Sequence, residues 1–361
     1  MDRRSFLTKA AIGGVTAAAA TSLAAPMYAQ GKRTLTMVTT WGRGLAGVHD
    51  AAQRTADTIT AMTDGQLTID LKAAGELVGA FEVFDAVTSG QADMYHGADY
   101  YFVGQHPAYA FFTAVPMGMT AQELSNWYYH GGGLEFHDEL GQIFGLKSFE
   151  AGNTGAQAGG WFRKEITGPD DFNGLKFRMP GLGGKALGKL GASVQNLPGG
   201  EVYQALSSGA IDGTEWIGPW ADEKAGFQEI TKFYYTAGFH EPGAGLTLAT
   251  NRDVFDGLTP AQQKIIEIAA GEANQWNLAQ FLTNNSAALT RLQAAGVKTL
   301  KFPDSVWDAF AKAADEVHQE NMGDELYKRV YDSFLASMKS SSAWLKLSDG
   351  DYTAQRDRTL G

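Results

Sequence analysis

Residues 174–220 read GLKFRMPGLGGKALGKLGASVQNLPGGEVYQALSSGAIDGTEWIGPW, and this stretch decides the fold. Short apolar runs alternate in it with segments of helical period, a pattern typical of βαβ units. We therefore expect strands at 174–178, 194–196 and 211–217 and helices at 184–190 and 200–207, with the glycine-rich run 181–184 as a connecting turn. Arg178 ends the first strand, and Glu215 stands beside Trp216 in the last. A guanidinium, a carboxylate and an indole are suited to recognition rather than to an obvious catalytic step.

The same alternation continues on the N-terminal side of this stretch. Predicted strands lie at 35–39, 67–71, 92–94 and 146–149, and predicted helices lie at 46–62, 81–88 and 134–144. Between Gly104 and Gly133 the pattern loosens into an aromatic stretch, which we interpret either as the wall of a cleft or as a loop layer packed on the core. Strands that alternate with helices predict an α/β protein with a mostly parallel sheet.

Two segments rich in glycine interrupt this pattern in the way that connections between domains do. The first is AGNTGAQAGG at 151–160, which contains Gln157, and the second is HEPG at 240–243. We therefore predict two lobes. One comprises residues 30–154 and about 244–290, and the other comprises residues 155–243 and about 291–330.

A long helix is predicted from Thr259-Pro260, an N-cap followed by proline at the first helical position, to about Ala295. At 1.5 Å per residue it is roughly 50 Å long, so we expect it to span both lobes. A strand at 297–302 and helices at 305–321 and 325–340 follow, and the chain ends in a polar tail. The apolar residues of the helical period after 325 predict either a cap on the second lobe or, within residues 331–361, a dimerisation element.

Residues 1–29 have the features of a twin-arginine export signal. Arg3-Arg4 precede an alanine-rich, weakly hydrophobic run and a small-residue exit near Ala29. The run is shorter than the roughly 20 apolar residues that cross a bilayer, and no later segment reaches that length. We therefore expect the mature chain in the periplasm; a short helix that stays on the protein is the alternative.

The composition excludes several classes of protein. The chain has no cysteine, which rules out disulfides, thiolate metal sites and a cysteine nucleophile. Its formal net charge is −11, and removal of the signal, which carries Asp2, Arg3, Arg4 and Lys9, leaves −13. Such a surface is a poor partner for nucleic acid or for anionic lipid. With 361 residues, of which 44% are hydrophobic, the chain is long enough for two domains.

Motifs of enzymes are scarce. The seven histidines fall in no spacing typical of a transition-metal site, and neither a GxSxG elbow nor a P-loop occurs. Residues 181–186 satisfy the dinucleotide pattern GxGxxA, but the next strand ends in Gln195-Asn196 instead of an acidic residue for the ribose, and Glu201 falls on the following helix. An exported, nucleotide-dependent oxidoreductase therefore remains as an alternative, as does an extracellular scaffold or adhesion module.

Arg178 is a candidate partner for a carboxylate. Its guanidinium is a rigid two-pronged donor, and each charge-assisted hydrogen bond contributes about 1.5–3 kcal/mol. At a strand end between Phe177 and Pro180 the side chain loses little further entropy on binding. An ordinary surface salt bridge is the alternative for this residue.

The motif FRMPG at 177–181 and the run GASVQNLPGGEVYQALSSGAIDGTEW at 191–216 resemble the signature of the solute-binding proteins of tripartite ATP-independent periplasmic (TRAP) transporters. The similarity extends from Leu35 to about Val330. It implies a two-lobed α/β fold of the Venus-flytrap type, and a non-enzymatic subunit that delivers an organic acid to membrane permease subunits. In that family the arginine of this strand pairs with the substrate carboxylate, a role that the resemblance carries onto Arg178.

The segment DGTEW at 212–216 is similar to the branch of that family that binds small 2-oxo or 2-hydroxy monocarboxylates, such as pyruvate or lactate, with a cation. In that branch a glutamine, a glutamate side chain and a tryptophan carbonyl hold the cation. These positions map to Gln157, Glu215 and Trp216. The resemblance thus implies Na⁺ or Ca²⁺ at the site; a dicarboxylate or a sugar acid is the alternative ligand within the family.

A count of charges favours a cation independently of the resemblance. Arg178, Glu215 and a monocarboxylate together carry −1, which is unfavourable in a partly desolvated cleft. Oxygen ligands suit a hard cation such as sodium or calcium. A salt bridge between Glu215 and Arg178 without a metal is the alternative.

Capture by closure of the two lobes is the expected mechanism. Trp41, Tyr100 and Tyr101 follow predicted strands of the first lobe, where side chains face a cleft. We expect these aromatic side chains to cover the ligand, with plain packing as the alternative.

Overall fold

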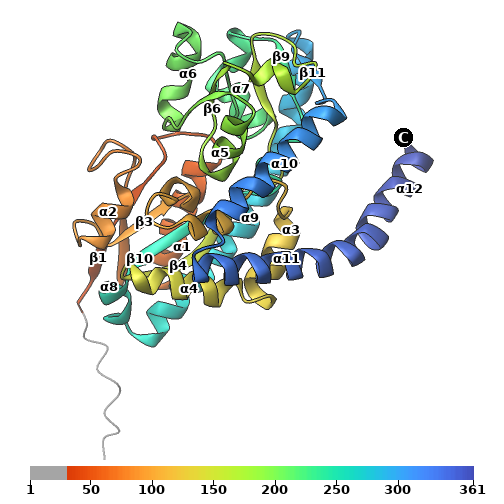
Figure 1. Cartoon of the computed structure of the whole chain (residues 1–361). Helices are drawn as coiled ribbons and strands as arrows, with labels where there is room; N and C mark the ends of the chain where they lie inside the picture. Colours follow the sequence, from red (N-terminus) through yellow and green to blue (C-terminus); the bar gives the residue numbers. More distant parts are fainter. Residues whose placement is uncertain (1–30) are drawn as a thin grey trace, which may run out of the picture.

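The computed structural model describes residues 31–361 of the protein (Figure 1). The twin-arginine signal predicted for residues 1–29 lies outside this range and stays a prediction. The described chain forms two sheets, with strand orders β2-β1-β3-β10-β4 and β11-β9-β5-β8-β6-β7. Within residues 31–361, no helix combines the length and the apolar character that crossing a membrane requires.

The first sheet is built from the N-terminal part of the chain and one later strand. β1 pairs in parallel with β2 and β3, whereas β10 pairs antiparallel with β3 and β4. Its strands are β1 (Arg33–Thr39), β2 (Leu67–Lys72), β3 (Met94–Gly97), β4 (Leu146–Asn153) and β10 (Gly245–Asn251). The helical elements in this part of the chain are α1 (Val48–Met62), α2 (Val83–Thr88), η1 (Asp99–Phe102), η2 (Pro107–Phe112), α3 (Ala121–His130), α4 (Gly133–Ile143) and α8 (Arg252–Asp256).

The second sheet is built from the middle of the chain and one strand after the long helix. β6 pairs in parallel with β7 and β8, and β9 with β11, whereas β5 pairs antiparallel with β8 and β9. Its strands are β5 (Gly160–Phe162), β6 (Lys176–Arg178), β7 (Ser193–Gln195), β8 (Gly213–Thr214), β9 (Phe233–Tyr235) and β11 (Lys298–Leu300). Its helical elements are η3 (Pro169–Phe172), α5 (Gly181–Lys189), α6 (Gly199–Ser208), α7 (Pro219–Ala225), η4 (Phe227–Glu229) and α10 (Asp304–Asn321).

The predicted alternation of strands and helices is confirmed, but the expectation of a mostly parallel sheet is wrong, because both sheets are mixed. The chain leaves the first sheet at the end of β4 and returns to it at β10, so these strands run in opposite directions. Between them, the Gln157 N–H donates to the Glu241 carbonyl, 3.0 Å away, and the Gly238 N–H donates to the Gln157 carbonyl, 2.8 Å away. The two crossing segments are therefore hydrogen-bonded to each other.

The long helix α9 (Pro260–Ala294) has the predicted start and end. The Thr259 hydroxyl accepts a hydrogen bond from the Gln262 N–H, which caps the helix, and Pro260 occupies the first turn. α9 packs against β4 of the first sheet, against α1 beside that sheet, and against α7 beside the second sheet (Figure 1). It contacts both halves of the molecule, as expected.

Two local predictions are wrong, and one of two alternative interpretations is confirmed. The glycine-rich run 181–184 is not a connecting turn but the first turn of α5, where a Cβ on Gly184 would lie 2.2 Å from the Met179 carbonyl oxygen. Close packing thus overrides the low helix propensity of glycine. The aromatic stretch at 104–133 contains η2 and α3. The apolar residues of η2 are buried in the core, which confirms the interpretation of this stretch as a layer packed on the core. The strand predicted at 92–94 lies at β3, which begins only at Met94.

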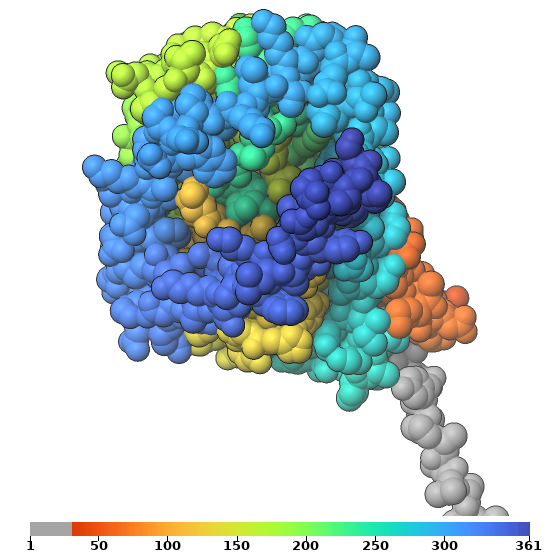
Figure 2. All heavy atoms as spheres, turned by 90° about the vertical axis from the view of Figure 1, so that its right-hand side faces the viewer, coloured from red at the N-terminus to blue at the C-terminus, as the bar shows by residue number. Residues whose placement is uncertain are grey.

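The C-terminal part is helical to its end, which corrects the predicted polar tail. It consists of α11 (Glu325–Leu345), a short π-helical turn η5 (Lys346–Gly350) and α12 (Asp351–Leu360). α11 packs mainly on α3 and η2 next to the first sheet, with Phe334 beside Phe111 and Trp127. Near its start it also contacts α10, where the Tyr327 hydroxyl lies 2.8 Å from His318 Nδ1. Figure 2 shows these helices lying across one face of the molecule, and α12 extends away from the body in Figure 1.

Candidate functional site

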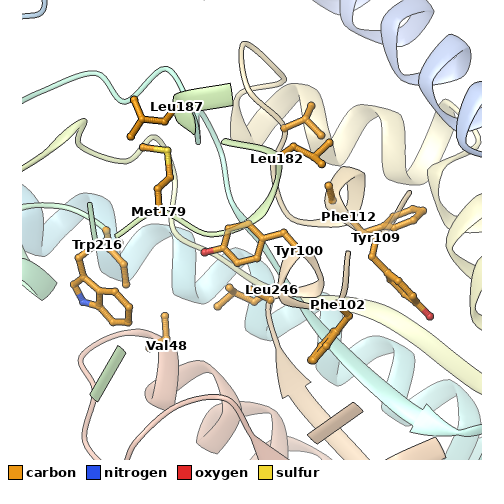
Figure 3. Packing of buried hydrophobic residues seen from close by; sticks show 14 of the residues in the cluster. Val48, Tyr100, Phe102, Tyr109, Phe112, Met179, Leu182, Leu187, Trp216 and Leu246 are labelled. Carbon is orange, nitrogen blue, oxygen red and sulfur yellow. The ribbon is translucent and has the colours of Figure 1, made fainter. Parts of the chain in front are cut away.

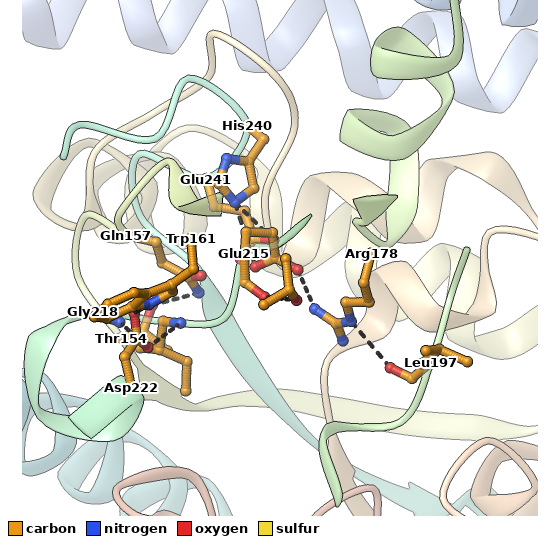
Figure 4. A network of polar contacts seen from close by, with 12 residues as sticks. Thr154, Gln157, Trp161, Arg178, Leu197, Glu215, Gly218, Asp222, His240 and Glu241 are labelled. Carbon is orange, nitrogen blue, oxygen red and sulfur yellow. Dashed lines mark hydrogen bonds and ion pairs between the residues drawn. The ribbon is translucent and has the colours of Figure 1, made fainter. Parts of the chain in front are cut away.

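Arg178 is completely buried at the end of β6. Its Nε donates to the carbonyl oxygen of Leu197, 3.1 Å away, and an Nη donates to the Glu215 carboxylate (Figure 4). The guanidinium carbon lies 5.5 Å from the ring centroid of Trp216. Burial opposes the positive charge, but the Glu215 carboxylate and the neighbouring Tyr101 and Tyr100 hydroxyls together outweigh burial and raise the pKa of Arg178. Protein groups alone therefore keep this side chain charged and in one orientation.

Glu215 reaches Arg178 because of the register of two short strands. β8 pairs in parallel with β6 so that Thr214 lies opposite Arg178, and the Glu215 N–H donates to the Arg178 carbonyl, 3.3 Å away. The structure thus brings together two residues that are 37 positions apart, and they form the direct ion pair that the sequence analysis names as an alternative for Glu215. Glu215 is completely buried, and its Oε2 has no hydrogen-bond partner among residues 31–361.

Gln157 lies beside this pair on the first crossing segment. Its Nε2 donates to the Thr154 hydroxyl, 3.1 Å away, while its Oε1 is buried and accepts no hydrogen bond from the described part of the chain. The Ala158 N–H donates to the carbonyl of Ile217, 2.9 Å away, which ties the crossing segment to the chain just after Trp216. Gln157 and Trp216 thus lie on two neighbouring segments of the chain that are hydrogen-bonded to each other.

Two further residues belong to this cluster, and the sequence reasoning missed their role. His240 Nε2 lies 3.5 Å from Glu215 Oε2 and 3.9 Å from Glu241 Oε1, and one ligating atom of each residue lies within 4.8 Å of the others. Burial, together with the Glu215 charge, raises the pKa of Glu241 well above its ordinary value. The available signal was HEPG at 240–243, because this segment crosses opposite Gln157.

The first half of the molecule contributes Tyr101. Arg178 Nη2 donates to its hydroxyl, 3.4 Å away, which is a direct polar contact between the two halves. The Tyr101 ring contacts that of Trp41 edge-on, with 6.2 Å between the centroids. Trp41 itself donates its Nε1 hydrogen to His96 Nδ1, 3.0 Å away, so the polar group of this indole points into the first sheet. Trp41 therefore supports Tyr101 and makes no polar contact with Arg178.

Tyr100 lies in the apolar layer between the halves. A Cβ on Gly181 would meet the Tyr100 side chain at 3.0–3.3 Å, so Tyr100 packs directly on the first turn of α5. Figure 3 shows its ring among Met179 and Leu182 of the second half and Leu246 of the first, all members of one continuous core cluster. The space that a dinucleotide would need at the GxGxxA motif is thus filled by an aromatic ring.

The oxygens of this cluster fit a hard cation. Glu215 Oε2, Gln157 Oε1 and both Glu241 oxygens are buried acceptors without a donor among residues 31–361. A buried polar group without a partner costs about 1–3 kcal/mol, a penalty that coordination to a cation relieves. Gln157, Glu215 and the Trp216 carbonyl offer oxygen, as sodium and calcium prefer.

Comparisons with known proteins agree on one family. The profile of the family described as bacterial extracellular solute-binding protein, family 7, matches residues 39–324. A relative from Nostoc sp., named monocarboxylate 2-oxoacid-binding periplasmic protein, is 41% identical over 317 residues, which cover 88% of this chain and 87% of the relative.

Two solved structures are similar in both fold and sequence. A TRAP transporter solute-binding protein from Bordetella bronchiseptica has a TM-score of 0.89 at 33% identity, over 91% of this chain and 98% of that one. That structure is a dimer of mixed occupancy, in which an active site with copurified calcium and picolinate is contrasted with an apo site. A TRAP periplasmic solute-binding protein from Pseudoalteromonas atlantica has a TM-score of 0.86 at 38% identity, over 90% of this chain and 99% of that one, and holds sodium and pyruvate.

Proposed function

The chain belongs to family 7 of the bacterial extracellular solute-binding proteins, and from that membership we propose that it captures a 2-oxo or 2-hydroxy monocarboxylate, such as pyruvate or lactate, with a cation. It is the periplasmic solute-binding subunit of a TRAP transporter. The observation that carries the proposed ligand is the buried Arg178–Glu215 pair beside Gln157. It offers one guanidinium for a carboxylate and unpartnered oxygens for a cation.

The ligands of the relatives support a chelating acid. Pyruvate binds with sodium in the Pseudoalteromonas protein, and picolinate with calcium in the Bordetella protein. Both molecules carry a second donor atom, a keto oxygen or a ring nitrogen, on the carbon next to the carboxylate. Carboxylate and donor can therefore close a chelate ring on one cation, and a 2-hydroxy acid has the same arrangement. Succinate lacks a donor at that position, so the alternative of a plain dicarboxylate is less well matched.

Each side chain has a distinct part in the proposed complex. Arg178 binds the ligand carboxylate, and Gln157, Glu215 and the carbonyl of Trp216 hold Na⁺ or Ca²⁺. The bound cation supplies positive charge that offsets the Glu215 and ligand carboxylates. Tyr101 holds the same guanidinium from the other half of the molecule.

Around the site, Tyr100 encloses the ligand and Trp41 supports the Tyr101 ring. No bond of the ligand is made or broken in this mechanism, since the residues bind and enclose.

Closure of two lobes is the proposed mode of capture. The lobes are residues 30–154 with about 244–290 and residues 155–243 with about 291–330, joined by the hydrogen-bonded crossing segments and by α9. Because Arg178 and Tyr101 come from different lobes, their contact exists only when the lobes are closed. The closed protein then delivers the acid to the membrane permease subunits of the transporter.

Binding measurements test this proposal. We expect chelator-treated, sodium-free protein to bind pyruvate or lactate weakly, and addition of Ca²⁺ or Na⁺ to increase both the affinity by calorimetry and the thermal stability. Succinate and a sugar acid serve as competitors from the alternative ligand classes. Pyruvate affinity that is the same with and without cation contradicts the cation site. Preference for succinate or the sugar acid contradicts the ligand class, and absorbance of a copurified nucleotide supports the oxidoreductase instead.

A homodimer through the C-terminal helices is the proposed assembly. Trp344, Leu347 and Tyr352 on these helices are 69%, 72% and 67% exposed. Beside α11 lies an apolar groove of about 230 Å³, lined among others by Val115, Phe334 and Met338. The groove suits an apolar helix of a second copy, and the Bordetella relative is a dimer.

Light scattering on the mature chain tests the assembly. We expect the mass of a dimer, which deletion of residues 346–361 converts to a monomer. Leu282→Asp, at an apolar position on α9 that is 60% exposed, is the control and leaves the mass unchanged. A monomeric full-length chain contradicts the proposal.

We also propose export through the twin-arginine pathway, directed by residues 1–29. Replacement of both Arg3 and Arg4 by lysine tests this route, and we expect it to abolish the appearance of the protein in the periplasm.

A further inference from the structure

Asp222 is a buried carboxyl group on α7, and Figure 4 shows it beside Trp161 and Gly218, on the side of the candidate site away from Arg178. Its Oδ1 accepts the N–H groups of Ile217 and Gly218, each 3.0 Å away. Its Oδ2 accepts the Nε1 hydrogen of Trp161, 2.9 Å away. Both carboxyl oxygens are thus engaged, and the carboxyl has one orientation.

The Ile217 N–H belongs to the same peptide group as the Trp216 carbonyl. Because a trans peptide is planar, its N–H and C=O point in opposite directions. An N–H that donates to Asp222 therefore turns the Trp216 carbonyl oxygen away from Asp222. No donor among residues 31–361 forms a hydrogen bond to that carbonyl oxygen.

The next peptide group shows which side the carbonyls face. The Gly218 N–H also donates to Asp222, and the Ile217 carbonyl of that peptide accepts from the Ala158 N–H, 2.9 Å away. Ala158 directly follows Gln157 on the crossing segment. The side opposite Asp222 is therefore the side of the crossing segment, where Gln157 Oε1 and Glu215 Oε2 lack partners.

We propose that Asp222 is a positioning residue for the cation: it anchors the Ile217 N–H and so aims the Trp216 carbonyl oxygen at the cation that Gln157 and Glu215 hold. The inference rests on the proposed function, in which that carbonyl is a cation ligand. A carboxyl oxygen that accepts the N–H also polarises the peptide group, which increases the negative charge on its carbonyl oxygen. Trp161 acts one step further out, because it fixes the orientation of the Asp222 carboxyl.

Calorimetry with Ca²⁺ and pyruvate on the mature protein tests this role. Asp222→Asn is nearly isosteric, but an amide has a single acceptor oxygen, so its NH₂ group faces either the Trp161 donor or the Ile217 and Gly218 donors. We expect the affinity for Ca²⁺ at saturating pyruvate to fall about 10–100-fold, the usual effect of losing a residue that orients a metal ligand. Pyruvate affinity measured at saturating Ca²⁺ stays close to the wild-type value, because Arg178 is untouched.

Two further variants make the test specific. Glu223→Gln is the matched control, since it makes the same change from carboxyl to amide one residue along α7. Glu223 pairs with Arg291, and we expect this variant to leave the Ca²⁺ affinity unchanged. Trp161→Phe releases the outer oxygen of Asp222 without changing the carboxyl, and it weakens Ca²⁺ binding in the same direction but less. This second variant keeps the inference testable if Asp222→Asn does not fold.

The outcomes are separable. If the wild type needs Ca²⁺ and both folded variants bind it as tightly as the wild type does, the positioning role is overturned while the proposed function stands. Equal losses for Ca²⁺ and for pyruvate at saturating Ca²⁺ also overturn it, because they indicate general support of the fold. If the wild type binds pyruvate with the same affinity in the presence and in the absence of Ca²⁺ or Na⁺, both the proposed cation site and this inference are overturned.

Discussion

At the scale of single residues, Arg178 combines full burial with a fixed direction. Leu197, Glu215 and Tyr101 each accept one of its hydrogens, and Trp216 lies against its face. A lysine has a single charged nitrogen and cannot replace this planar set of donors. The site therefore depends on the shape of the guanidinium as well as on its charge.

Arg178→Lys is expected to weaken pyruvate binding roughly 10–150-fold, corresponding to the loss of about 1.5–3 kcal/mol from a charge-assisted hydrogen bond. Titration calorimetry at saturating Ca²⁺ measures the change. Lys185→Ala, at an exposed cation on α5, is the control for a general loss of positive charge. An affinity within about twofold of the wild type, a free-energy difference well below one such bond, argues against the role of Arg178.

Glu150 gives a second prediction at this scale, on stability. The residue is buried on β4, and burial raises its pKa to about 8. The unfolded chain has a glutamate pKa of about 4.3, so between these values the folded state holds a proton that the unfolded state releases. The free energy of unfolding therefore falls as pH rises through this window, by up to ~1.4 kcal/mol per pH unit.

Glu150→Gln is expected to remove this contribution and to be more stable than the wild type at pH 8. Denaturant unfolding at several pH values measures the difference in slope. Glu135→Gln replaces an exposed carboxylate near the same sheet and leaves the slope as in the wild type. Parallel pH profiles for the wild type and Glu150→Gln contradict the prediction.

At the scale of elements, α9 is the helix that contacts both halves of the molecule. The buried amide of Asn277 accepts from the Asn153 N–H, 3.2 Å away, and donates to the Gly47 carbonyl, 2.9 Å away. One turn on, Phe281 packs against Gly47 on one side and against the Trp220 ring on the other, at 5.6 Å between centroids. A helix interior rarely favours asparagine, so bridging of separate segments explains its presence here.

Gly47→Ala tests the contact between α1 and α9. Gly47 has a φ of +79°, and a Cβ there would lie 2.2 Å from the Phe281 ring. Gly44 has a nearly equal φ of +78°, and a Cβ on Gly44 would meet nothing within 4 Å, so Gly44→Ala carries the backbone strain alone.

We expect Gly44→Ala to lower the free energy of unfolding by about 1–2 kcal/mol and Gly47→Ala to lower it by about 1–3 kcal/mol more. Chemical denaturation gives both values. Equal losses for the two variants indicate that Phe281 moves aside without a penalty.

At the scale of the whole molecule, one apolar cluster runs through both halves around the site. Tyr100 and Tyr101 of the first half contact Gly181 and Arg178 of the second. The structure thus has the contacts of a closed form, and opening has to separate these aromatic residues from α5 and β6. A ligand that binds Arg178 and Gln157 stabilises the closed form by its preference for it.

Small-angle scattering is expected to show this preference. The radius of gyration of the monomeric chain lacking residues 346–361 decreases when pyruvate and Ca²⁺ are added together, and each alone has less effect. Arg178→Lys needs higher pyruvate for the same decrease. A radius that stays constant on saturation, shown by calorimetry on the same sample, contradicts ligand-driven closure.

Much of the fold follows from local pattern. Thr259-Pro260 predicts the start of α9, and the apolar runs at 35–39 and 67–71 predict β1 and β2, because capping and alternation are written in neighbouring residues. The helix predicted at 184–190 is α5, but its first turn at 181–184 escapes such reading, since glycine is a poor helix former and only the close Met179 carbonyl explains why Gly184 stands there. The helical C-terminus and the mixed pairing of the sheets escape it as well.

For the site, the sequence by itself determined the set of residue types: an arginine at a strand end, a glutamate before a tryptophan, and a glutamine in a crossing segment. The tertiary structure alone decided that Glu241 and His240 join them and that Asp222 stands behind the Trp216 peptide. Their placement depends on the register of β6 with β8 and on the antiparallel crossing of two distant segments. Register of this kind is set by packing between parts of the chain far apart in sequence, which no local periodicity encodes.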